Sequence, residues 1–173
     1  MLEKKKVAVL VEDTYQDLEA WYPLLRLREA GVEVVAVGTG RAKTYKGKYG
    51  YPIDEDCAAS EISAAELDGI VIPGGYAPDI LRRYAPVLKL VKDCYEQGKV
   101  VAAICHAGWV LVSAQACKGR KATCFSAIKD DLINAGAEYV DEEVVRDGNL
   151  ITSRKPDDLP AFCRTILEAL EEG

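Results

Sequence analysis

Short apolar runs alternate with longer amphipathic segments along most of the chain. The apolar runs are nearly free of charge, as expected of strands that helices cover on both faces; they span residues 6–11, 32–37, 69–72 and 100–104. The amphipathic segments repeat apolar residues at helical spacing; they span residues 17–30, 79–97, 128–136 and 157–172. This alternation predicts an α/β fold with a mostly parallel sheet, in which function gathers beyond the carboxyl ends of the strands.

Smaller signals refine this outline. Pro23 predicts a kink in the first helix or a displaced start, and Pro86 predicts an interruption of the second. Ser63-Ala64-Ala65-Glu66 has the form of a capping box and predicts a short helical turn. The remaining predictions are a turn or hairpin over 38–50, an irregular strand within 51–62, strands at 121–125 and 138–140, a hairpin of 143–146 with 150–153, and a last helix capped by Asp157 or Asp158.

The fourth apolar run ends abruptly at Cys105-His106, and a second apolar segment follows with Trp109, Val112 and Ala116 at helical spacing. This pattern predicts a strand, a sharp turn and a helix, with Cys105 at a nucleophile elbow. The N–H groups at the start of that helix would face the sulfur, so we expect the thiol to be partly ionised at neutral pH. This stretch alone leaves open a second interpretation, a buried structural cysteine between a core strand and a core helix.

Composition narrows the class of protein. With 173 residues, 49% of them apolar and 29% charged, the chain suits one globular domain spanning residues 1–173. A net charge of -6 argues against specific binding to nucleic acid or to an anionic membrane. No signal peptide and no membrane-spanning stretch is recognisable, so the expected location is the cytoplasm.

The six cysteines lack paired spacing, which favours free thiols over a disulfide framework. His106 is the only histidine, which excludes a zinc site built from several histidines; we expect neither a metal nor another cofactor. Its place directly beside Cys105 favours the catalytic interpretation of that cysteine.

A catalytic site can be assembled around Cys105 as the nucleophile. The N–H groups of His106 and of the Gly74-Gly75 turn after the third strand would form an oxyanion hole, and Glu19 and Asp79 are candidate tuning carboxylates. Adjacent side chains generally point in different directions. The sequence therefore leaves open whether His106 takes the thiol proton directly, and an acid would be needed to orient it.

Five segments, spread over nearly the whole chain, occur in an order typical of one family: Gln16-Asp17-Leu18-Glu19 with Tyr22-Pro23, Pro73-Gly74-Gly75-Tyr76-Ala77-Pro78-Asp79, Ala103-Ile104-Cys105-His106-Ala107-Gly108, residues 128–136 and residues 144–154. On these segments the chain resembles the ThiJ/PfpI superfamily, and more closely its PfpI-like intracellular protease and deglycase branch.

The resemblance implies a flavodoxin-like three-layer sandwich with Cys105 and His106 in the site. It also implies that a protonated Glu19 hydrogen-bonds the sulfur and that Asp79 reaches His106 of a neighbouring subunit, so that a homodimer or hexamer would have its active sites at subunit interfaces. The chain departs from the archaeal protease pattern at Asp79, where that pattern has Glu, and at Phe125, where it has Tyr.

Three functions follow as hypotheses. The first is a cysteine-dependent enzyme. As a deglycase or glyoxalase it would act on methylglyoxal, glyoxal or their early adducts on proteins, and as an intracellular cysteine peptidase it would act on a peptide. The second is a stress-response protein with chaperone activity, in which Cys105 senses oxidation. The third, a glutamine amidotransferase, requires a downstream histidine that this chain lacks.

Overall fold

The structure is a computed structural model that describes residues 1–173. Its centre is a seven-stranded sheet in the order β10-β11-β7-β6-β1-β2-β5, in which only β10 runs antiparallel to its neighbour. The strands of this sheet are β1 (Lys6–Leu10), β2 (Glu33–Gly38), β5 (Cys57–Ala58), β6 (Gly69–Ile72), β7 (Val100–Ile104), β10 (Val144–Asp147) and β11 (Leu150–Ser153). Two small pairs lie outside it: β3 (Thr44–Lys46) with β4 (Pro52–Asp54), and β8 (Lys121–Ala122) with β9 (Glu138–Tyr139).

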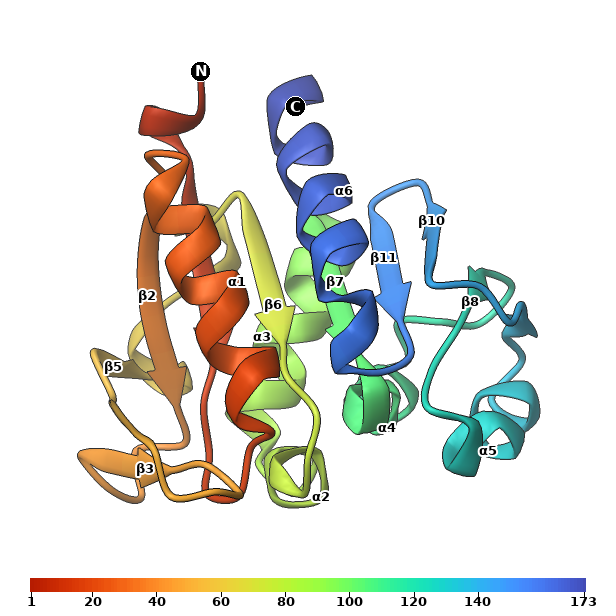
Figure 1. Ribbon diagram of the computed structural model, residues 1–173, viewed down its shortest axis with the longest axis horizontal. Helices are drawn as coiled ribbons and strands as arrows, with labels where there is room; N and C mark the ends of the chain where they lie inside the picture. The colour runs from red at the N-terminus through yellow and green to blue at the C-terminus, as the bar shows by residue number, and fades with distance from the viewer.

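Helices cover both faces of the sheet, with α1 and α6 on one face and α3 and α4 on the other (Figure 1). The helices are α1 (Asp17–Glu29), α2 (Ala77–Leu81), α3 (Ala85–Glu96), α4 (Gly108–Ser113), α5 (Lys129–Asn134) and α6 (Leu159–Glu172). None of them is long and apolar enough to cross a membrane. The central strands are buried on both faces, which explains why their sequences are continuous apolar runs rather than alternating ones.

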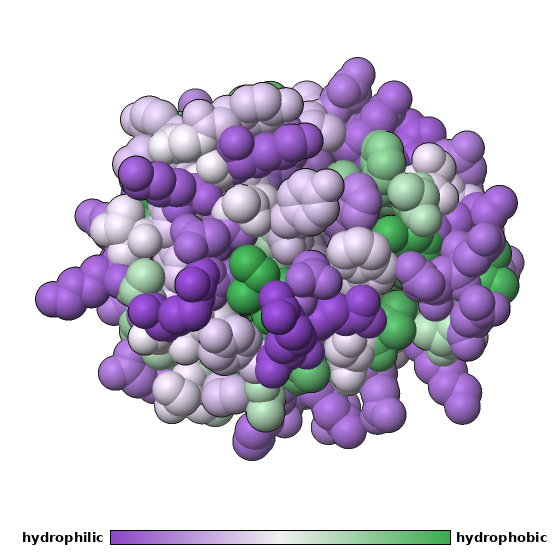
Figure 2. Space-filling model, turned by 90° about the horizontal axis from the view of Figure 1, so that it is seen from below, coloured by the Kyte–Doolittle hydropathy of each residue, from purple (hydrophilic) through white to green (hydrophobic).

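The predicted mostly parallel sandwich with an elbow after the fourth strand is confirmed. Strands β1, β6 and β7 are direct neighbours, so the chain segments that follow them meet at one edge of the sheet. Viewed onto that edge, hydrophobic residues form several small groups between hydrophilic ones (Figure 2). The capping box is also present, since Glu66 Oε2 accepts the N–H of Ser63 at 2.9 Å.

Several details differ from the predictions. The predicted interruption of the helix over 79–97 is present, but the break lies earlier, at residues 82–84. Pro86 instead fits in the first turn of α3, where its missing N–H needs no partner. Helix α1 begins at Asp17 and continues through Pro23, so the displaced start is wrong. The strand predicted over 121–125 has only two residues. The carboxylate of Asp158 binds the N–H and guanidinium of Arg154 instead of capping the last helix.

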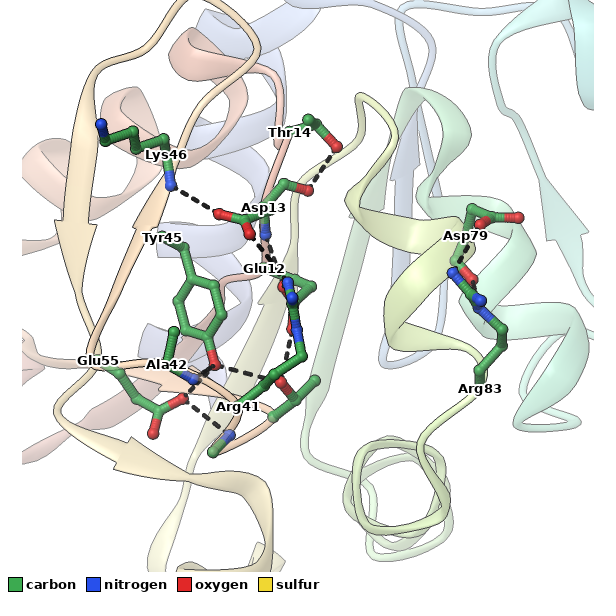
Figure 3. A network of polar contacts seen from close by, with 12 residues as sticks. Glu12, Asp13, Thr14, Arg41, Ala42, Tyr45, Lys46, Glu55, Asp79 and Arg83 are labelled. Atoms are coloured by element: carbon green, nitrogen blue, oxygen red, sulfur yellow. Dashed lines mark hydrogen bonds and ion pairs between the residues drawn. The ribbon is translucent and has the colours of Figure 1, made fainter.

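A buried carboxylate fixes the loop that follows β1. The side chain of Glu12 is fully buried and accepts hydrogen bonds from the guanidinium of Arg41, the hydroxyl of Thr39 and the N–H of Asp13 (Figure 3). Nearby, the Tyr45 hydroxyl donates to Glu55 Oε2 at 3.0 Å. These contacts tie the β1–α1 loop to the segment between β2 and β4, because a buried charge must keep its partners.

We predict that Glu12→Ala lowers the free energy of unfolding by about 2 kcal/mol, because it removes the buried carboxylate that pairs with Arg41 and accepts the hydroxyl of Thr39. Chemical denaturation measures this loss. The control Lys43→Ala changes an exposed cation of the same segment and should stay within about 0.5 kcal/mol of the wild type. Equal effects of the two substitutions would contradict the role of Glu12.

Candidate active site

Cys105 lies at a sharp bend between β7 and a short 3-10 turn, Cys105–Ala107. Its φ of 62° falls in the left-handed region, which a non-glycine residue adopts only where the surrounding structure holds it. The carbonyl oxygen of Cys105 accepts the N–H of Phe125 at 3.2 Å, which helps to hold the bend. The α-helix itself begins only at Gly108, so the groups closest to the sulfur are single backbone amides rather than a long helix terminus.

The Gly74-Gly75 turn after β6 packs between the elbow and the start of α1. A Cβ atom at Gly74 would lie 2.5 Å from Glu19 Oε1 and 2.8 Å from Cys105 Cβ, so no side chain fits there. Gly75 has a φ of 78° and pairs with Tyr15 in an isolated antiparallel bridge. The turn therefore requires glycine at both positions and brings the first turn of α1 against the elbow.

Glu19 is fully buried beside the sulfur. Its Oε1 accepts the N–H of Gly74 at 3.0 Å, and its Oε2 is buried without a hydrogen-bond partner. Burial raises the pKa of Glu19 to about 7, with the N–H of Gly74 and the thiol of Cys105 acting in the opposite direction. The carboxyl group is thus poised to hold a proton at neutral pH.

Burial likewise raises the pKa of Cys105 to about 12, and the negative charge of Glu19 is the second cause; the N–H groups of His106 and Gly75 bind the sulfur and lower the pKa. The expectation that the thiol is partly ionised at neutral pH is therefore wrong, because burial outweighs the backbone donors. Since Glu19 and Cys105 face each other, they titrate as a pair, which loses its first proton near pH 7. Because the pKa of Glu19 lies well below that of Cys105, this first proton comes from the carboxyl group, and the thiol keeps its proton until a base accepts it.

The imidazole of His106 reaches the neighbouring sulfur, with Nδ1 3.2 Å from Cys105 Sγ. The structure therefore places the ring within reach of the thiol, whereas adjacent side chains generally point in different directions. The ring stacks on Phe125 with centroids 5.0 Å apart and meets Trp109 edge-on at 5.3 Å. Burial lowers the pKa of His106, and the ammonium of Lys48 lowers it further. A neutral imidazole in this position can accept the thiol proton.

Asp79 does not join this group within one chain. It lies exposed on α2, where its Oδ2 pairs with the guanidinium of Arg83 at 3.1 Å (Figure 3). The structure therefore brings together Cys105, His106 and Glu19, with the amides of Gly74 and Gly75 directed at Glu19 and Cys105 respectively. No group of three or more His, Cys, Asp or Glu side chains could hold a metal ion.

Sequence reasoning named three further residues but did not predict their contacts around the site. Trp109 and Phe125 flank the imidazole, and the side chain of Gln16 caps α1 by accepting the N–H of Glu19 at 3.0 Å. The helical spacing of Trp109 marked it only as a core residue. Gln16 begins one of the segments that carry the resemblance, but a glutamine just before a helix is a weak capping signal, so its capping role was not predicted.

Residues 5–169 match the DJ-1/PfpI family model, and the chain belongs to this family. It is 45% identical to "Deglycase TK1284" of Thermococcus kodakarensis over 95% of this chain and 99% of that protein. It is 44% identical to "Protein/nucleic acid deglycase 2" of Escherichia coli over 96% and 98%.

Solved structures agree with this assignment. A two-domain protein of Anabaena variabilis, with DJ-1/ThiJ/PfpI-like and ferritin-like domains, gives a TM-score of 0.95 at 47% identity; the match covers 97% of this chain but only 48% of that protein. DJ-1beta of Drosophila melanogaster gives 0.87 at 28% identity, over 98% and 95%. The predicted relationship and flavodoxin-like fold are thereby confirmed.

We predict that Glu19→Gln removes a pH dependence of stability. The folded pKa of Glu19, about 7, lies above its ordinary value of 4.5, so the folded state binds the proton more tightly and stability falls as the pH rises between these values. Relative to the variant, the wild type should lose up to about 3 kcal/mol of unfolding free energy between about pH 4 and pH 8. Denaturation series of both proteins across this range measure the difference; a constant difference would show that Glu19 titrates normally.

Proposed function

We propose that the chain is a cysteine-dependent enzyme acting on reactive carbonyl compounds, either a small dicarbonyl such as methylglyoxal or its early adduct on an amine. The observation that carries this proposal is the 3.2 Å approach of His106 Nδ1 to Cys105 Sγ beside the buried Glu19. The names of the relatives as deglycases support the substrate class. The six free cysteines are consistent with a reducing, cytoplasmic location.

In the proposed reaction, His106 accepts the thiol proton and the sulfur of Cys105 attacks the aldehyde carbon. The N–H groups of Gly75 and His106, which already face the sulfur, hold the new oxyanion. For methylglyoxal, the imidazolium first returns its proton to the oxyanion. The neutral imidazole then moves the proton of the former aldehyde carbon to the adjacent carbonyl carbon, and the hydroxyl proton passes to the other oxygen, giving a thioester of lactate that water hydrolyses. The overall reaction converts the dicarbonyl and water into the hydroxy acid, and it needs no external oxidant.

We propose further that the enzyme works as a homodimer or hexamer in which Asp79 acts on His106 of a neighbouring subunit. Asp79 is exposed and free to meet a second copy once it leaves Arg83. One face of α1 exposes the apolar side chains of Leu18, Tyr22 and Leu25. Contact with another subunit would bury these side chains.

We predict that Cys105→Ala abolishes the conversion of methylglyoxal to lactate without unfolding the protein. A lactate assay and a parallel assay with a peptide substrate measure this. Cys57→Ala is the matched control, because Cys57 is partly exposed and lies outside the site. Lactate from the Cys105→Ala protein would exclude Cys105 as the nucleophile. Cleavage of the peptide alone would favour the peptidase, and neither product would favour the redox-sensing stress protein.

A subunit-mixing experiment tests the shared site. Cys105→Ala and Asp79→Asn should each be strongly impaired, but a refolded equimolar mixture should recover activity in about a quarter of the sites of a random dimer, because one site of each mixed pair has both residues. Mixed samples are compared with each variant alone. A mixture no more active than its components would refute the contribution of Asp79 from a neighbouring subunit.

A further inference from the structure

Trp109 connects the surface of the molecule to the imidazole of the site. On its inner side, the indole meets the His106 ring edge-on, with centroids 5.3 Å apart and planes at 69°. On its outer side, Trp109 Nε1 donates to Asp131 Oδ2 at 2.8 Å. The guanidinium carbon of Arg82 lies 5.6 Å from the indole centroid, within the range of a cation–π contact.

The anchors of Trp109 come from different elements of the fold. Asp131 belongs to α5, Arg82 follows α2, and Trp109 itself is in the first turn of α4. Arg82 is held in turn, because its Nε donates to Ser113 Oγ at 2.9 Å. Three separate elements therefore fix the position and tilt of one indole.

His106 depends on its neighbours for its orientation. It is only partly buried, and the one polar contact of its ring is the 3.2 Å approach of Nδ1 to Cys105 Sγ. Phe125 stacks on the ring at 26°, while Trp109 meets it at 69°. Two aromatic neighbours at different angles leave the imidazole little freedom to rotate away from the sulfur.

We propose that Trp109, anchored by Asp131 and Arg82, is a positioning residue that holds Nδ1 of His106 against the sulfur of Cys105. This inference rests on the proposed function, since His106 must be the base for its orientation to matter. Trp109 does not touch the reacting atoms and acts through the imidazole alone. Loss of its indole therefore reduces turnover while substrate binding is retained.

The chain offers a direct test because His106 is its only histidine, so its imidazole proton signals in an NMR titration need no assignment. The charged or titratable groups near the ring are Cys105, Lys48, and Arg82 and Asp131 beyond the indole. The variants are Trp109→Leu, Asp131→Ala and the conservative Asp131→Asn, whose amide oxygen can still accept from Nε1. Trp21→Phe changes the other tryptophan and is the control.

We expect Trp109→Leu to raise the pKa of His106 toward its ordinary value of 6.5, because the ring loses a buried neighbour. Its kcat should fall about five- to tenfold with KM changed less than about twofold, as the loss of an aromatic pair implies. Asp131→Ala should show about half of this effect on a logarithmic scale, and Asp131→Asn should restore wild-type behaviour. Trp21→Phe should match the wild type in every measurement.

Unchanged His106 signals and kcat in a folded Trp109→Leu protein would overturn the proposal. If that variant does not fold, the Asp131 pair decides: equal behaviour of Asp131→Ala and Asp131→Asn would also overturn it. The failure of the proposed function looks different, because the wild type would then produce no lactate while the His106 titration still responded to Trp109→Leu. In that case Trp109 would orient an imidazole that takes no part in catalysis, and the positioning role would be overturned as well.

Discussion

The site depends on a close approach of backbone that leaves no room for a side chain at residue 74. The turn after β6 passes between the first turn of α1 and the elbow, with Glu19 Oε1 on one side of Gly74 and the Cβ of Cys105 on the other. Any larger residue would separate the carboxyl group from the sulfur. Because strands β1, β6 and β7 are adjacent, this single contact brings three distant parts of the chain together.

Burial at this contact determines the chemistry. Taken out of water, both Glu19 and Cys105 favour their neutral forms, and their pKa values rise. Backbone amides then favour negative charge at two defined places, with Gly74 donating to the carboxylate and Gly75 and His106 donating to the sulfur. Near neutral pH the pair has one charge and one proton to distribute. A neutral imidazole 3.2 Å from the sulfur adds a base that can accept the proton when substrate arrives.

Much of this could be predicted from the sequence, because local patterns encode local geometry. An apolar run ending at Cys105, and a Pro-Gly-Gly turn after a similar run, define two strand ends, and parallel strands place such ends at one edge. The reach of His106 to Cys105 could not be predicted, since it depends on a φ of 62° at Cys105. The aromatic neighbours of His106 and the pairing of Asp79 with Arg83 depend on packing that no local pattern specifies.

The coupling of Glu19 to Cys105 is the central claim, and the rate at which a small neutral reagent alkylates Cys105 tests it most directly. Mass spectrometry of the Cys105 peptide, measured across pH for the wild type and Glu19→Gln, separates this thiol from the other five. The account predicts that the wild-type rate rises only well above neutral pH, and that this rise moves to lower pH in the variant, because the negative charge of Glu19 is one cause of the raised pKa of Cys105. The same pH profile in both proteins would contradict it.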